Sequence, residues 1–269
     1  MLFKRIVSFV IGAPVLLATL FYPEPVLFKV LVGLSSLFAL NEFYTMTFAV
    51  RSKRFFGLVL GAFYGLTVLF SARGELFFMV PVALVIVSSF AYTLLEAQSP
   101  SEPLAESTHQ VALYLLGTFY VTGFTLYIGL LRELPMGIFW VLALLVGTWM
   151  NDSCAFFVGK GIGRHKLSPR VSPGKTVEGF IGGLLGTAAG LFILRGLFHE
   201  PISFQQTILL ALIIGFLGPA GDLAESLIKR SYQVKDSGSL IPGHGGVLDR
   251  IDALIFNAPF VYTLALILK

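Results

Sequence analysis

Apolar runs long enough to cross a membrane follow one another along nearly the whole chain. A membrane-spanning helix needs about 20 mostly apolar residues. Hydrophobic residues make up 56% of the 269 residues and charged residues only 13%, against about 25% charged in an ordinary soluble domain. The mean hydropathy is +0.85. The sequence therefore predicts an all-α polytopic membrane protein with about nine spans, at 4–22, 26–48, 55–72, 76–95, 110–131, 135–158, 177–198, 203–226 and 251–268.

The first run begins MLFKRIVSFVIGAPVLLATLFY, a basic start followed by an apolar stretch, as in a signal peptide. No small-x-small cleavage site follows it, and the next apolar run begins at once. We therefore expect an uncleaved first span. The single cysteine, Cys154, excludes an internal disulfide, so the fold does not need an oxidising compartment.

Positive charge is unevenly divided between the two sides of such a bundle. With nine spans, the N-terminus and the even-numbered loops share one side, which holds 14 of the 19 Lys and Arg residues. Because loops rich in Lys and Arg stay in the cytoplasm, we expect a cytoplasmic N-terminus and an outer C-terminus in the cell (inner) membrane. Residues 1–135 would form a scaffold of about five spans. Residues 136–269 would form the catalytic region, with cytoplasmic loops at 159–176 and 227–250.

Five acidic residues lie near the cytoplasmic ends of the later spans. Charges at membrane depth cost roughly 2.5–3.5 kcal/mol each, so they are seldom incidental. Two pairs are spaced i,i+3, which places both members on one helix face. Carboxylates without soft ligands nearby suit Mg²⁺, whereas ion pairing with Lys229, Arg230 and Arg250 is the alternative. The five are Asp152, Asp222, Glu225, Asp249 and Asp252.

The basic loop 159–176, GKGIGRHKLSPRVSPGKT, faces the same side. Ser172 and Pro173 have the pattern of a helix N-cap followed by proline at the first helical position. The helix that follows would point its N-terminal amides toward the acidic region, as a phosphate site requires. PRVSPGKT is not a P-loop, because Pro169 stands where that motif needs glycine. The alternative role of this loop is that of a topological anchor.

A second polar loop, KDSGSLIPGHGGVLDRID at 235–252, precedes the last apolar run. Its four glycines allow positive φ and a close approach of backbone to ligand. Its bases can contact anions, and His244 can donate or accept a hydrogen bond. A glycine-rich turn beside acids and bases fits a polyphosphate carried with its metal.

The first half of the chain offers one acid at a buried-looking position, Glu42. We expect it to snorkel or to pair with Lys29 or a neighbouring helix, which is a structural role.

The segment SLIKRSYQVKDSGSLIPGHGGVLDRID, 226–252, resembles the signature of the phosphatidate cytidylyltransferases. That signature runs Ser-x-apolar-Lys-Arg, four residues, Lys-Asp-x-small, then apolar-Pro-x-His-Gly-Gly and Asp-Arg-x-Asp, with no departure here. HKLSPRVSPGKTVEGFIGG, 165–183, is similar to the other recurrent stretch of that family. The resemblance covers the C-terminal 120 residues in detail and the remainder only as hydrophobic spans.

The resemblance implies the reaction of CTP with phosphatidate to give CDP-diacylglycerol and pyrophosphate, dependent on Mg²⁺, with a second cation left open. It implies metal ligation by Asp222 and Asp249, with Asp152 and Asp252 as further candidates. Phosphates would be held by Lys229, Arg230, Lys235 and Arg250, and Asp236 belongs to the same motif. His244, Gly245 and Gly246 would shape the nucleotide loop, while nucleotide or lipid phosphate would contact Lys166, Ser172, Lys175 and Thr176.

The expected partners are CTP, phosphatidate and membrane lipid, with no nucleic acid. Gly182, Gly186 and Gly190 recur every four residues, a spacing that lets helices approach closely. This spacing serves either a dimer or packing within one chain, and the resemblance favours a homodimer. Two other classes stay open: another CTP-using membrane enzyme, such as a polyprenol kinase, and an ion transporter, which should place its acids near the bilayer midplane.

Overall fold

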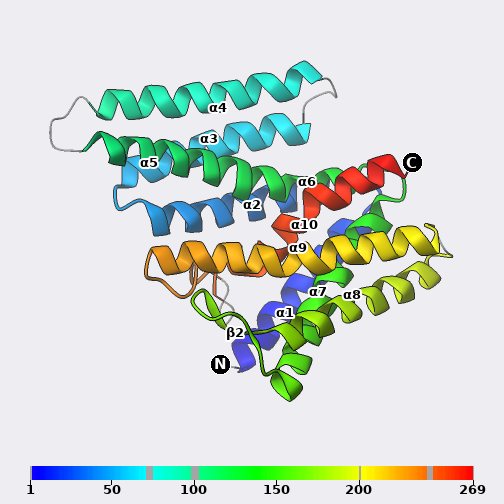
Figure 1. Ribbon diagram of the computed structural model, residues 1–269. Coiled ribbons are helices and arrows are strands. Elements are labelled where there is room, and N and C mark those ends of the chain that lie inside the picture. The colour runs from blue at the N-terminus through cyan, green and yellow to red at the C-terminus, as the bar shows by residue number, and fades with distance from the viewer. Residues whose placement is uncertain (1, 71–74, 98–102, 200, 241–244, 269) are drawn as a thin grey trace.

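The chain folds into a bundle of long helices with one small hairpin (Figure 1). The structure is a computed structural model that describes residues 2–70, 75–97, 103–199, 201–240 and 245–268. The elements are α1 (Leu2–Phe21), α2 (Val26–Thr47), α3 (Arg51–Phe70), α4 (Glu75–Glu96), α5 (Leu104–Leu115), η1 (Leu116–Gly123), α6 (Phe124–Leu131), α7 (Gly137–Ile162), β1 (Lys166–Ser168), β2 (Ser172–Thr176), α8 (Val177–Leu197), α9 (Phe204–Ser231) and α10 (Leu248–Ile267).

The all-α membrane fold predicted from hydropathy is confirmed. Within the described residues, eight helices are long and apolar enough to cross a membrane. The first predicted span coincides with α1, whose described apolar part, Gly12–Phe21, is shorter. Helices α7 and α9 run four and five residues past their predicted ends, to Ile162 and Ser231. The acids and bases near those ends are therefore held on rigid helix.

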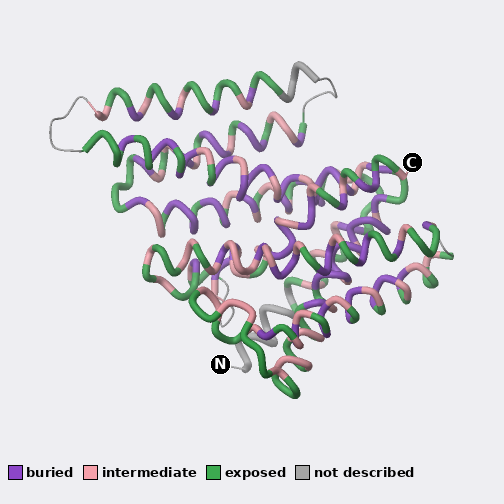
Figure 2. Tube along the Cα trace, in the orientation of Figure 1, coloured by how far each residue is buried: buried purple, intermediate pink, exposed green. Residues whose placement is uncertain are grey.

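The helix connections alternate between the two ends of the bundle (Figure 1). The start of α1, the α2–α3 connection, the end of α4, the start of α5, the β hairpin, the end of α9 and the start of α10 lie at one end. The end of α1, the start of α2, the α6–α7 connection, the end of α8, the start of α9 and the end of α10 lie at the opposite end. The two polar loops singled out in the sequence therefore meet at one end, which we call the polar end. Figure 2 shows that the buried residues run along the faces where helices meet, while the outer helix faces are exposed.

The fifth span is not a continuous α-helix, because η1 is a π-helical segment between α5 and α6. Its wider turn packs against Tyr44 of α2. A Cβ added at Gly117 would lie 2.6 Å from the Tyr44 ring. The Tyr44 hydroxyl donates to the Tyr114 carbonyl at 3.0 Å. π-Helical segments inside α-helices are frequent at functional sites.

The glycine repeat of α8 packs against α7 in the same chain. A Cβ added at Gly182 would lie 2.6 Å from Val158 Cβ, and one at Gly186 would lie 2.6 Å from Cys154 Cβ. Small residues here let the two helices approach closely. The repeat therefore serves packing within one chain, and the homodimer stays a prediction.

The predicted N-cap at Ser172 is wrong. Ser172–Thr176 forms β2, which pairs antiparallel with β1. Helix α8 begins only at Val177, and Thr176 is its N-cap, with Oγ1 accepting from the Gly179 N–H at 3.1 Å. The hairpin satisfies the backbone groups that a longer helix would have used, and it places Lys175 one residue before the helix N-cap.

Candidate active site

A cavity of about 540 Å³ opens at the polar end of the bundle. Helices α7, α8 and α9 and the hairpin form its walls. Acidic, basic and hydroxyl side chains share this cavity with the aromatic rings of Phe156 and Phe180. Its polar lining residues are Asn151, Asp152, Lys160, Ser172, Lys175, Thr176 and Asp222.

Lys175 spans the cavity wall from β2 to α9. Its Nζ lies 2.7 Å from Asp222 Oδ2 and donates to the Pro219 carbonyl at 3.3 Å. Both side chains are partly exposed, at 23% and 35%, so an incoming anion can reach the ammonium group. The structure thus joins two predicted site residues that are 47 positions apart in the sequence.

The N-terminus of α8 also faces this cavity, since Thr176 and Gly179 line it. Glu178 in the first turn accepts from the Arg164 N–H at 3.0 Å and contacts His165 Nδ1 at 2.6 Å. These contacts fasten the loop before the hairpin to the start of the helix. The N–H groups of Val177 and Gly179 already donate to the His165 carbonyl and to Thr176 Oγ1, so the feature of this helix start that favours an anion is the positive end of the helix dipole.

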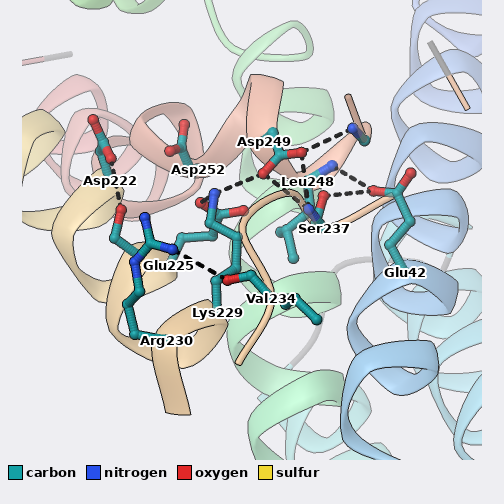
Figure 3. Close-up of polar contacts among 12 residues, drawn as sticks. Glu42, Asp222, Glu225, Lys229, Arg230, Val234, Ser237, Leu248, Asp249 and Asp252 are labelled. Atoms are coloured by element: carbon teal, nitrogen blue, oxygen red, sulfur yellow. Dashed lines mark hydrogen bonds and ion pairs between the residues drawn. The ribbon is translucent and has the colours of Figure 1, made fainter. Parts of the chain in front are cut away.

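A second group of charges lies further along the same face of α9 (Figure 3). Glu225 and Lys229 follow Asp222 at helical spacing, and Lys229 forms ion pairs with both Glu225 and Asp249. The Lys229 Nζ to Asp249 Oδ1 distance is 2.7 Å. Lys229 thereby ties the end of α9 to the start of α10.

Asp249 also organises the loop before α10. Its carboxylate accepts from the Ser237 N–H at 3.0 Å and from the Gly246 N–H at 2.8 Å. Gly245 has φ +83°, a left-handed conformation that favours glycine. The predicted positive φ is confirmed at Gly245 and is wrong for Gly238 and Gly246, while Gly243 lies outside the described residues.

The carboxylates differ in what they leave for a cation. Both oxygens of Asp249 and both oxygens of Asp222 already have partners in the protein, but the Asp249 side chain is only 5% exposed, whereas that of Asp222 is 35% exposed. Asp152 and Asp222 line the cavity, and Asp252 is close enough to interact electrostatically with both. These three acids provide hard oxygen ligands without thiolate or imidazole, which suits Mg²⁺. Among the described residues, however, no three acidic, His or Cys side chains converge into an assembled metal site.

The remaining predicted site residues lie around this centre. Lys166 is exposed on β1, and Arg250 is exposed on the first turn of α10. Lys235 and Asp236 are exposed in the α9–α10 connection. Arg230 is exposed as well, and its guanidinium donates to the Val234 carbonyl at 3.5 Å. The role predicted for His244 lies outside the described residues.

Glu42 is a site neighbour that the sequence did not indicate. Of the partners expected for Glu42, Lys29 is wrong, because its Nζ lies 2.6 Å from Glu133 Oε1. The expected contact with a neighbouring helix is confirmed, because the Leu248 N–H of α10 donates to Glu42. Glu42 contacts the α9–α10 loop and the start of α10. The one available signal was that a buried acid in an apolar helix needs donors around it.

Tyr232, directly after α9, links the site to α5. Its hydroxyl lies 3.2 Å from His109 Nε2. Burial, and secondarily the charge of Glu106, raise the pKa of the Tyr232 hydroxyl above its ordinary value. The hydroxyl therefore stays protonated and holds the last turn of α9 against α5.

The helices that are long and apolar enough to cross a membrane, with a charged cavity at one end, define an integral-membrane protein with a charged candidate site. Residues 3–268 match the model of the cytidylyltransferase family, and the chain belongs to that family. It is 34% identical over 253 residues to the phosphatidate cytidylyltransferase of Thermotoga maritima, covering 90% of each chain.

Two further relatives match about half of this chain. The chain is 41% identical over 153 residues to the phosphatidate cytidylyltransferase of Bacillus subtilis, covering 54% of this chain and 57% of that one. It is 48% identical over 122 residues to the uncharacterized protein YnbB of Escherichia coli, covering 45% and 41%. The resemblance noted in the sequence is thus confirmed as family membership.

Proposed function

We propose that this chain transfers the cytidylyl group of CTP to phosphatidate, forming CDP-diacylglycerol and releasing pyrophosphate. The observation that carries the proposal is the cavity at the polar end. It combines Lys175, the N-terminus of α8 and the acids Asp152 and Asp222 in one space within a membrane bundle. Family membership and the names of its relatives support the same reaction.

The chemistry requires little covalent help from the protein. A phosphate oxygen of phosphatidate attacks the α-phosphorus of CTP, and the bond from that phosphorus to the oxygen bridging the α- and β-phosphates breaks. The leaving group is pyrophosphate. Because the attacking phosphate is already anionic, no general base is needed. Catalysis then consists of positioning the two phosphates and neutralising their charge.

The residues of the cavity suit these two tasks. Lys175 is held at the wall by Asp222 and the Pro219 carbonyl, so its ammonium group is fixed where a phosphate would enter. The positive end of the α8 dipole lies on the adjacent wall and favours an anion there. Lys229 and Asp249 fix the α9–α10 loop beside the cavity, and the exposed bases Arg230, Lys235 and Arg250 are available to the polyphosphate.

Mg²⁺ belongs to the proposal, with Asp152, Asp222 and Asp252 as the residues that would hold it. The ion would supply charge neutralisation to the phosphates of CTP. Asp249 was predicted as a ligand, but its contacts favour a role in holding the loop. A second cation stays a prediction.

We place the polar end at the cytoplasmic face of the cell (inner) membrane. The uneven distribution of Lys and Arg supports this orientation. CTP would enter from the cytoplasm and phosphatidate from the adjoining leaflet, so that a soluble and a bilayer-bound substrate can meet at one site.

The test is incubation of purified protein with phosphatidate, Mg²⁺ and CTP labelled on the α-phosphate. Labelled CDP-diacylglycerol in equal amount to pyrophosphate is the expected result. A kinase would instead release CDP and phosphorylate its acceptor. A transporter would give no product, and either outcome would refute the proposal.

A further inference from the structure

Glu42 reaches from α2 to the loop that carries the family motif. One carboxylate oxygen accepts from the Ser237 hydroxyl at 3.2 Å and from the Leu248 N–H at 2.9 Å. The other oxygen accepts from the Val247 N–H at 3.0 Å. The side chain is buried, so water does not compete for these contacts. Figure 3 shows Glu42 pointing from its own helix toward Ser237 and Leu248.

These contacts make Glu42 the N-terminal cap of α10. The first N–H groups of a helix have no partner within the helix. The N-cap residue, Val247, has no side-chain oxygen that could accept from them. Glu42 supplies that oxygen from another helix, and its negative charge is favourable beside the positive end of the helix dipole.

The loop is shaped around this carboxylate. A Cβ added at Gly238 would lie 2.7 Å from Glu42 Oε1, and its three nearest neighbours would all be Glu42 atoms. The backbone of Gly238 does not need glycine, because Gly245 is the one described glycine with positive φ. A side chain at 238 would therefore have to displace the Glu42 carboxylate from its present contacts.

The same loop residues connect Glu42 to the charged centre. Ser237 donates its hydroxyl to Glu42 and its backbone N–H to Asp249. Asp249 in turn accepts from Lys229. A shift of the loop away from Glu42 would thus move the partners of Asp249, and with them the ammonium group of Lys229.

We propose that Glu42 is a positioning residue for the cytidylyl transfer, acting through Ser237 and the start of α10 on Asp249 and Lys229. This inference rests on the proposed function. Glu42 does not reach the cavity itself; it sets the place of the loop and of the first turn of α10 while the substrates react.

The test compares Glu42→Ala, Glu42→Gln and Gly238→Ala in purified form, each assayed well below its own midpoint of thermal unfolding. We expect Glu42→Ala to lower kcat about a hundredfold with little change in KM for phosphatidate, since small misplacements of a catalytic centre cost rates of that order. Glu42→Gln keeps the size and one acceptor oxygen, so it should recover part of kcat.

The double variant Glu42→Ala/Gly238→Ala provides the specific readout. Gly238→Ala alone should lower kcat because its methyl group meets Glu42. In the Glu42→Ala background the same methyl group should have almost no effect, because the carboxylate is gone. Additive losses would overturn the proposed link. If Glu42→Ala does not fold, Glu42→Gln and Gly238→Ala still test it, through kcat at an unchanged midpoint of unfolding.

Glu133→Ala is the matched control, a carboxylate that pairs with Lys29 at a distance from the polar end. It should lower the midpoint of unfolding and leave kcat unchanged. A Glu42→Ala variant that behaves in the same way would reduce Glu42 to a stabilising residue and overturn the inference. An inactive wild-type enzyme would instead refute the proposed function, so the two failures can be told apart.

Discussion

Replacing Asp249 by Asn tests the part of the site that joins α9, α10 and their connecting loop. The substitution keeps the size of the side chain and removes its charge. Lys229 then loses one of its two carboxylate partners, and an amide NH₂ group takes the place of one acceptor oxygen. That NH₂ group faces a donor, because Lys229 Nζ and the N–H groups of Ser237 and Gly246 all donate to Asp249.

The expected size of the effect follows from burial. The side chains of Asp249 and Lys229 are only 5% and 12% exposed. Removing one partner of a buried ion pair costs about 3–5 kcal/mol. Lys229 keeps Glu225, so the lower limit applies, about 3 kcal/mol. If this free energy stabilises the active position of the loop, its loss lowers the fraction of molecules with the loop in that position. The fraction falls roughly a hundredfold, since each tenfold change is about 1.4 kcal/mol.

The assay is the initial rate of labelled CDP-diacylglycerol formation by purified protein, with thermal unfolding in detergent to verify the fold. Glu133→Gln is the control, because it makes the same change in another Lys–carboxylate pair, with Lys29, away from the cavity. A rate for Asp249→Asn within about threefold of the wild-type rate would refute the reasoning, since that corresponds to less than 1 kcal/mol.

Mg²⁺ separates the two roles considered for Asp249. A ligand that binds only the native state raises its stability. If Asp249 holds the loop, Asp249→Asn should keep most of the Mg²⁺-dependent rise in unfolding temperature, whereas Asp222→Asn should lose it. The reverse pattern would restore Asp249 as a metal ligand.

Three further predictions concern the hairpin and the start of α8. Lys175→Ala should lower kcat/KM for CTP about a hundredfold, as removal of a transition-state charge contact does, with little change in unfolding temperature; a near-normal value would leave the loop as a topological anchor. Thr176→Val should lower the free energy of unfolding by about 1 kcal/mol through loss of the N-cap, and an unchanged midpoint would show that the cap is dispensable. Arg170→Cys in a Cys154→Ser background should react with impermeant thiol reagents from the cytoplasmic side only, and labelling from outside intact cells would reverse the orientation.

The spans could be predicted from the sequence because their cause is local. Every residue of a membrane helix meets lipid or another apolar helix, so hydropathy within one window is sufficient. The hairpin could not be predicted in this way. Ser172 and Pro173 match a helix start locally, but the pairing of Ser172–Thr176 with Lys166–Ser168 depends on a partner outside the window.

The charged centre shows the same limit more clearly. The acids and bases were recognisable, yet their pairing depends on which helices meet. Lys175 forms an ion pair with Asp222, and Lys229 forms ion pairs with Glu225 and Asp249. Lys29 could have been excluded from the alternatives for Glu42 by geometry. Thirteen residues on one helix separate the two by about 20 Å at 1.5 Å per residue, too far for an ion pair.

The contacts of Glu42 also change how the first spans are understood. Hydropathy alone suggested that they are a scaffold beside a separate catalytic region. Leu40 and Phe43 of α2, however, share one buried cluster with Leu248 and Ile255 of α10. The first turn of α10 is thus packed, capped and positioned by α2, while its Asp249 holds the site loop. A core of this kind transmits small displacements. A change in the volume of a buried α2 side chain should therefore displace Lys229 and also change the stability of the fold. The N-terminal spans therefore contribute to the geometry of the reaction, although the acids and bases of the site come from the later helices.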